Sequence, residues 1–146
     1  MSIISKMILT FILFISFVVS THSKMKDQAY MLVNSNNLKS LGFTDGYSGF
    51  VKVDLNNDGV DEIIEYNYSS STPPGTCDKD DCMSSINNNP MLTFQIKDTE
   101  DKIIDVAYFC TSVGVLSEMH KGMKDIFCGP KYILRWNGES YETDDD

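Results

Sequence analysis

Residues 50–68, which read FVKVDLNNDGVDEIIEYNY, decide the fold of this chain. The runs at its two ends, Phe50–Val53 and Ile63–Tyr68, have the β-branched and aromatic composition of strands. In the second run the apolar residues alternate, so that they fall on one face of a strand. We therefore predict two antiparallel strands joined by the oxygen-rich loop Asp54–Glu62.

The loop has the ligand spacing of a calcium site. Side-chain oxygens occur at its positions 1, 3, 5 and 9, and Gly59 at position 6 allows a sharp turn because it has no Cβ. Ca²⁺ accepts about six to eight oxygen ligands in flexible geometry, and carboxylates crowded into a short loop repel one another without a cation. The predicted ligands are Asp54, Asn56, Asp58, the backbone carbonyl of Val60, and Glu62.

Two other interpretations of the loop stay open. One is a metal-free acidic turn that carries this spacing by chance. The other is an EF-hand with Glu65 at position 12, but that motif needs flanking helices and an apolar residue at position 8, where this chain has Asp61. The flanking strands therefore favour a hairpin that binds Ca²⁺ rather than Mg²⁺, with Glu65 facing solvent.

The N-terminal residues have the pattern of a secretory signal peptide. Lys6 is followed by the apolar run Met7–Val19 and then by small residues suited to cleavage. This run of 13 residues is shorter than the roughly 17–25 that span a membrane, although an uncleaved anchor is the alternative. We expect a signal peptide at residues 1–23 and one periplasmic or secreted domain at residues 24–146.

Charge and cysteine usage agree with an exported binding protein. The chain has 12 basic and 21 acidic residues, a net charge of −9, and loss of the leader removes one lysine. Such a domain repels nucleic acid and attracts basic partners, unless the acidity only keeps it soluble. An even number of cysteines favours disulfides, and of three possible pairings we favour Cys77–Cys82 and Cys110–Cys128. A zinc site is disfavoured by the cysteine spacing.

The rest of the chain predicts a mostly β fold, α+β at most, as a small antiparallel domain with one short N-terminal helix. The helix is expected within Lys24–Leu41, with Asp27 as its N-cap, and Ser69–Pro90 is expected to be a long surface loop. Further strands are predicted at Met91–Lys97, Ile103–Phe109, Val113–Leu116, Ile126–Cys128 and Tyr132–Trp136, with Trp136 and Tyr141 as core or hairpin partners.

Two resemblances bear on these predictions. Asp54–Ile64 resembles the calcium loop of integrin-type FG-GAP and VCBS repeats, which implies that positions 1, 3, 5, 7 and 9 bind the ion, here with Glu62 in place of the commoner Asp. Those repeats build propellers in series, and this chain has one copy. With Gly122–Ile126 and Trp136–Tyr141, the chain also resembles small exported bacterial proteins that combine such a loop with GxxDI and WNGxxY elements. That group has largely unassigned function, so the resemblance implies a single exported β domain and no reaction.

We expect a calcium-binding β module that acts by binding a protein, and specifically an immunity or inhibitor protein of the cell envelope. The expected partner is a basic toxin or lytic enzyme, and neither nucleic acid nor a stable membrane anchor is expected. One alternative is a structural envelope protein. The other is a calcium-dependent hydrolase that uses His120 as a base with Asp125 and Ser117. A histidine in a polar turn is usually solvated, so we expect no catalytic residues.

Overall fold

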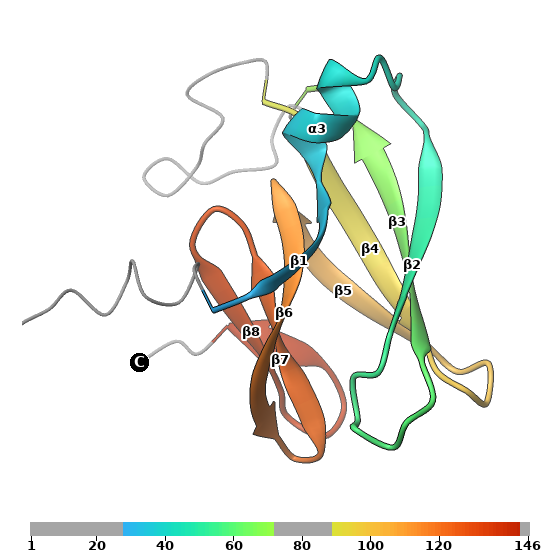
Figure 1. Cartoon of the computed structure of the whole chain (residues 1–146), viewed down its shortest axis with the longest axis vertical. Helices are drawn as coiled ribbons and strands as arrows, with labels where there is room; N and C mark the ends of the chain where they lie inside the picture. Colours follow the sequence, from blue (N-terminus) through green and yellow to red (C-terminus); the bar gives the residue numbers. More distant parts are fainter. Residues whose placement is uncertain (1–27, 72–88, 144–146) are drawn as a thin grey trace, which may run out of the picture.

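The computed structural model describes residues 28–71 and 89–143, which form two antiparallel sheets (Figure 1). One sheet has the strand order β1-β6-β7-β8-β9 and the other has the order β2-β3-β4-β5. The predicted small, mostly β domain is confirmed. Its strands are β1 (Tyr30–Asn34), β2 (Ser48–Val53), β3 (Glu62–Ser69), β4 (Met91–Lys97), β5 (Ile103–Cys110), β6 (Ser112–His120), β7 (Met123–Cys128), β8 (Tyr132–Trp136) and β9 (Tyr141–Thr143).

The hairpin predicted at residues 50–68 is present. Strand β2 pairs antiparallel with β3, from Ser48 opposite Asn67 to Val53 opposite Glu62. The alternating apolar residues of β3 are buried, as their spacing predicted. On its other edge β3 pairs with β4, and β4 pairs with β5 through a polar turn at residues 98–102. The sequence pattern therefore predicted most of this four-stranded sheet.

The helix at the N-terminal end is shorter than predicted and starts later. Part of the expected helix is instead strand β1, which pairs with β6, and the helix α3 spans only Ser35–Ser40. The side chain of Asn34 caps α3 by accepting two backbone N–H bonds of 2.9 and 3.3 Å. The asparagine-rich run at residues 34–37 is thus the start of the helix. The predicted N-cap, Asp27, lies outside the described residues.

Both sheets pack on one hydrophobic core. Buried side chains from the two sheets, from α3 and from the loop after β2 belong to a single cluster. The chain crosses from one sheet to the other at Thr111, between β5 and β6. Beside this crossing, Cys110 of β5 and Cys128 of β7 form the predicted disulfide. The other favoured pairing, Cys77–Cys82, lies outside the described residues.

The predictions about membrane and export fall partly outside the described chain. In residues 28–71 and 89–143, no helix is both long and apolar enough to cross a membrane. The expected signal peptide at residues 1–23 lies outside this part. Most of the expected surface loop, Ser69–Pro90, also lies outside it. These two predictions therefore stay predictions.

Candidate metal centre and its surroundings

The polar side chains of the predicted calcium loop fold back onto the loop's own backbone. The Asp54 carboxylate accepts hydrogen bonds from the backbone N–H of Asp58 at 3.2 Å and of Gly59 at 2.8 Å. Asn56 Oδ1 accepts from Asp58 N at 3.1 Å, and Asp58 Oδ1 accepts from Val60 N at 2.8 Å. The oxygens at positions 1, 3 and 5 are therefore gathered on the inner side of one curled segment.

Two positive φ angles make this curl. Asn57 has φ 62° and Gly59 has φ 86°. Asparagine tolerates the left-handed region better than most residues, and glycine adopts it without a steric penalty. A Cβ added at Gly59 would meet no atom within 4 Å. The glycine is therefore required by the backbone angle and not by lack of space.

Glu62 has a different position from the other predicted ligands. It is the first residue of β3, and only 2% of its surface is exposed. Its Oε2 accepts a hydrogen bond of 2.7 Å from the backbone N–H of Leu55. The carboxylate therefore closes the base of the loop, where sequence reasoning expected it to close the shell of a bound ion.

The donor set fits Ca²⁺ in chemical type, although the three predicted carboxylate ligands do not form one cluster. Among the described residues, no three His, Cys, Asp or Glu side chains are arranged to hold a metal ion. Every predicted ligand is an oxygen, which is the ligand that Ca²⁺ prefers. An ionised carboxylate has about four lone-pair positions, so one that accepts one or two N–H bonds can still bind a cation.

The loop is attached to the opposite sheet, which sequence reasoning missed. Leu55 is fully buried in the core, and its carbonyl oxygen accepts a 2.7 Å hydrogen bond from the backbone N–H of Lys124 in β7. The Lys124 Nζ atom donates to the carbonyl oxygen of Asp54 at 2.8 Å. The available signal was Leu55 itself, an apolar residue within an otherwise polar loop.

Tyr141 supports the strand that holds the loop. Its hydroxyl donates a 2.9 Å hydrogen bond to the carbonyl oxygen of Lys124. Burial, together with the nearby carboxylates of Asp125 and Glu62, raises the pKa of Tyr141. Trp136 lies opposite Tyr141 across β8 and β9, with ring centroids 5.3 Å apart, which confirms them as hairpin partners. Two sequence elements named from resemblance therefore meet at Lys124, next to the predicted metal loop.

The residues of the hydrolase alternative are only partly brought together. His120 is the last residue of β6, and not a turn residue as predicted; its Nδ1 lies 2.7 Å from Asp125 Oδ1. Asp125 is 1% exposed, and its other oxygen lies 3.5 Å from Nε of Arg135. Ser117 is exposed, and within the described chain it makes no hydrogen bond to His120. The pair can orient an imidazole, but it has no bonded nucleophile in this part of the molecule.

Comparisons with protein-family models, with curated proteins and with solved structures find no match for the chain. The fold class alone does not indicate a function, because β domains of this kind serve many purposes. Any functional conclusion therefore depends on the loop, its attachment and the exposed surface around it.

Proposed function

We propose that this protein is an exported calcium-binding β module that acts by binding another protein. The observation that carries the calcium part is the gathering of the Asp54, Asn56 and Asp58 oxygens on one side of the curled loop. A cation bound there would offset repulsion between the carboxylates. Since the loop is attached to β7 through Lys124, the ion would also stiffen the contact between the two sheets.

The calcium proposal is tested by thermal unfolding with Ca²⁺ and with a chelator. Extracellular calcium modules bind with dissociation constants on the order of 10⁻⁴–10⁻³ M. At ten times such a constant, binding stabilises the fold by about 1.4 kcal/mol, which raises the Tm by about 5 °C in a domain of this size. An unchanged Tm, with no metal found by elemental analysis, would refute the proposal.

A matched pair of variants assigns the effect to the proposed ligands. Asp58→Asn keeps the shape of the side chain and removes a charge from a proposed ligand, so it should abolish most of the calcium-dependent rise in Tm. Asp61→Asn makes the same change in the same loop at a residue outside the proposed set. If both variants lose the calcium-dependent rise in Tm equally, calcium binding depends on the overall charge of the loop, and the assignment of Asp58 as a ligand is wrong.

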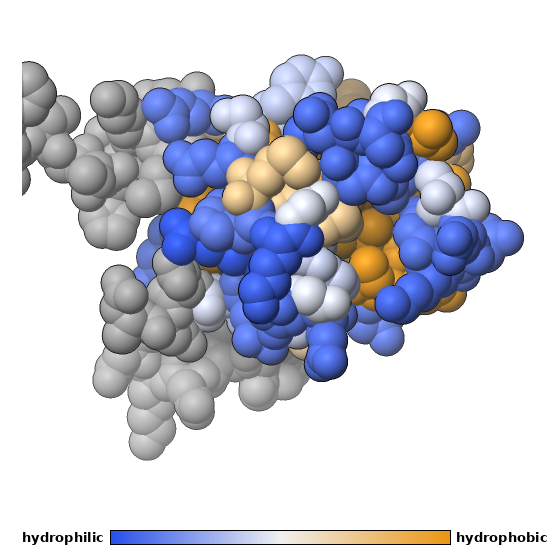
Figure 2. Space-filling model, turned by 90° about the horizontal axis from the view of Figure 1, so that it is seen from below, coloured by the Kyte–Doolittle hydropathy of each residue, from blue (hydrophilic) through white to orange (hydrophobic). Residues whose placement is uncertain are grey.

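The protein-binding part is supported by charge and by exposed apolar side chains close to the loop. The chain has a net charge of −9. Phe50 of β2 is 62% exposed and Val60 of the loop is 54% exposed. Figure 2 views the end of the molecule where the loop lies and shows hydrophobic side chains among mostly hydrophilic ones. An acidic surface with exposed apolar residues suits a basic partner, such as a toxin or lytic enzyme of the envelope.

Affinity capture from envelope extracts tests this role, followed by binding of the purified partner. We expect a basic protein whose association slows as salt increases, because complementary charge mainly raises the association rate. Phe50→Ser should weaken the complex. Leu41→Ser is the control and should not weaken it, because this 75% exposed side chain lies next to α3 and away from the loop. A toxin-like neighbouring gene would name the first candidate. No captured partner in the presence of calcium would favour a purely structural envelope protein.

One observation favours the hydrolase as a second candidate. The 2.7 Å contact between His120 Nδ1 and buried Asp125 is the geometry that orients an imidazole for proton transfer. The rival explanation is structural, because Arg135 and His120 together surround the buried carboxylate. A hydrolase screen decides between them. Activity that His120→Ala abolishes while the protein stays folded supports catalysis, and activity that survives in this variant excludes His120 as the base.

A further inference from the structure

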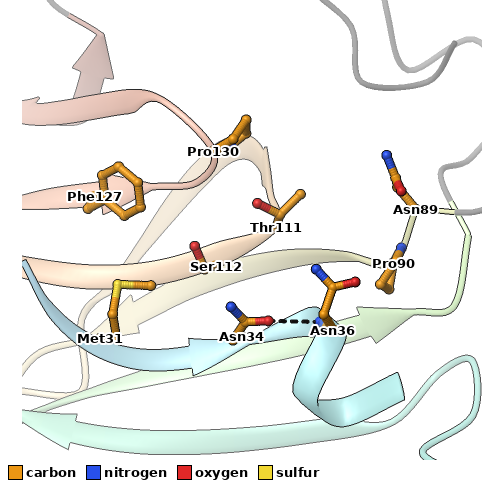
Figure 3. Close-up of a pocket in the computed structure, with 9 residues that line it drawn as sticks. All are labelled: Met31, Asn34, Asn36, Asn89, Pro90, Thr111, Ser112, Phe127 and Pro130. Carbon is orange, nitrogen blue, oxygen red and sulfur yellow. Dashed lines mark hydrogen bonds between the residues drawn. The ribbon is translucent and has the colours of Figure 1, made fainter. Parts of the chain in front are cut away.

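A separate cavity lies at the end of the molecule opposite the calcium loop. Its volume is about 240 Å³, and four described parts of the fold line it: β1 with the start of α3, Asn89–Pro90 before β4, the crossing from β5 to β6, and the end of β7 with the turn to β8 (Figure 3). This volume is below the roughly 300–1,000 Å³ of pockets that enclose drug-sized ligands. The cavity therefore suits a ligand of one ring.

Two hydroxyl groups face this cavity, and neither has a hydrogen-bond partner among the described residues. The backbone groups of Thr111 and Ser112 are bonded: Thr111 N donates to Gly129 O, and Gly129 N donates to Ser112 O, each at 2.8 Å. The side-chain hydroxyls of both residues, in contrast, make no hydrogen bond within the described chain, and Figure 3 shows them directed into the space. Both residues are less than 9% exposed. Neither hydroxyl is among the enclosed polar atoms that lack a partner in the described residues, so each is open to the cavity and can bond to a ligand or to water.

Gly129 makes the room that these hydroxyls occupy. A Cβ at this position would collide with Ser112 Oγ and would lie 2.9 Å from Thr111 Oγ1. The glycine is therefore needed for space, in contrast to Gly59 of the calcium loop. Its small size keeps the two hydroxyls side by side at the wall of the cavity.

The remaining wall defines the chemistry of a ligand. Asn34 uses its Oδ1 to cap α3, and this leaves its amide NH₂ group, together with the side-chain amide of Asn36, at the cavity. Phe127, Pro130 and Met31 supply apolar surface. None of the lining residues that the structure describes carries a charge, although the chain as a whole is strongly acidic. Hydroxyl and amide groups both donate and accept hydrogen bonds, and a polyol requires such mixed partners.

We infer that this cavity binds one neutral sugar ring, with its hydroxyls on Thr111, Ser112 and the two asparagine amides and its apolar edge against Phe127 and Pro130. Among the described lining residues, an anion would find no cationic group and a cation would find no carboxylate. The site is independent of the calcium loop and of the protein partner proposed above. A free monosaccharide and the end of a glycan share this chemistry.

Amide chemical-shift mapping by NMR on the oxidised protein tests the inference. The neutral probes are glucose and N-acetylglucosamine, and the charged controls are glucuronate and glucosamine. We expect a neutral probe to shift the amides of Ser112 and Gly129 with a dissociation constant on the order of 1–10 mM, because few contacts are available. The β-linked disaccharide of N-acetylglucosamine separates the two sources, since tighter binding than the monosaccharide indicates a glycan end.

A double variant, Thr111→Val with Ser112→Ala, removes both hydroxyls and leaves the backbone bonds in place. It should weaken binding by about tenfold, which is the loss of two ordinary hydrogen bonds. Ser48→Ala, on β2 of the other sheet, is the control and should bind normally. The inference is overturned if neither neutral probe shifts these amides, if the charged sugars bind equally well, or if the folded double variant binds like the wild type.

Discussion

At one end of β7, Cys128 forms a disulfide with Cys110 of β5; at the other end, Lys124 holds the loop Asp54–Glu62 through two hydrogen bonds. Both connections join the same two sheets. The first is covalent, and Ser35 reinforces that end of the fold by donating from its backbone and its hydroxyl to Thr111 O. The second consists of hydrogen bonds and one buried leucine, in a loop that carries several carboxylates.

The difference indicates how each end can respond to its surroundings. A disulfide holds its end closed regardless of ions, as long as the compartment is oxidising. The loop end has no such constraint, and its carboxylates repel one another. Calcium would therefore act where the fold has the weaker connection, and the following changes test that assignment from the largest expected effect to the smallest.

Leu55→Ala should destabilise the attachment of the loop Asp54–Glu62 to the core. The side chain is fully buried, so its truncation leaves a cavity where the loop meets the core. We expect a loss of about 2.7–5 kcal/mol in the free energy of unfolding, measured by urea denaturation. Val60→Ala, in the same loop at a 54% exposed side chain, is the control and should change stability little. Equal effects of the two variants would mean that the loop is not anchored in the core.

Opening the disulfide should weaken the other end by a similar or slightly smaller amount. Replacing both Cys110 and Cys128 by Ala removes a cross-link between residues 18 positions apart. The chain-entropy model predicts about 3 kcal/mol for a closed loop of this size. Urea denaturation should give the same loss whether or not calcium is present, because the loop lies at the opposite end of β7. A loss that calcium restores would show that the two ends are coupled.

Lys124→Met sharpens the comparison by removing one hydrogen bond from the loop end. Methionine keeps the apolar stem and loses the ammonium group that donates to Asp54 O at 2.8 Å. We expect about 1–2 kcal/mol of destabilisation, because the bond is charged and partly buried. Lys121→Met is the matched control: Lys121 Nζ also donates to a carbonyl oxygen, that of Asn137, at 2.7 Å, but at an exposed site. A larger effect at Lys121 would contradict the importance of burial.

The sequence predicted the hairpin because its pattern is local. Alternation in β3 indicated which face is buried, and the polar residues of the loop indicated where the strands end. The prediction of one helix within Lys24–Leu41 was wrong at β1, where a strand and a short helix follow one another and Asn34 caps the helix. A helical spacing of a few apolar residues is too weak to decide against pairing with a distant strand such as β6.

The attachment of the candidate site could not be predicted for a related reason. Lys124 and Asp54 are 70 positions apart, so their bond depends on how the two sheets pack. Glu62 carries the same carboxylate that a calcium ligand needs, and only the fold places it beneath the loop against Leu55 N. His120 and Asp125, named together only in the disfavoured hydrolase alternative, are in contact because β6 and β7 form a hairpin. Local spacing thus predicted the hairpin and its loop, and tertiary packing determined the contacts that the loop residues make.

Tyr141→Phe should have the smallest effect at neutral pH and a distinct one in alkali. The variant loses the 2.9 Å bond to Lys124 O, at a cost of about 0.5–1.5 kcal/mol. Because burial and the carboxylates of Asp125 and Glu62 raise the pKa of Tyr141, the folded chain keeps this hydroxyl protonated where the unfolded chain has ionised it. The stabilisation is therefore complete below about pH 10, the unfolded pKa, and is lost as the pH rises above it.

The measurement is the free energy of unfolding between neutral pH and strong alkali. Wild-type stability should fall above about pH 10, and Tyr141→Phe should fall less steeply, because one of the buried tyrosines no longer opposes ionisation. Some slope should remain in the variant, since burial also raises the pKa of Tyr66 and Tyr68. Tyr30→Phe, at a 75% exposed ring, is the control. If Tyr141→Phe and the wild type lose stability in parallel, the alkaline sensitivity belongs to the β3 side of the core and not to the strand that holds the loop.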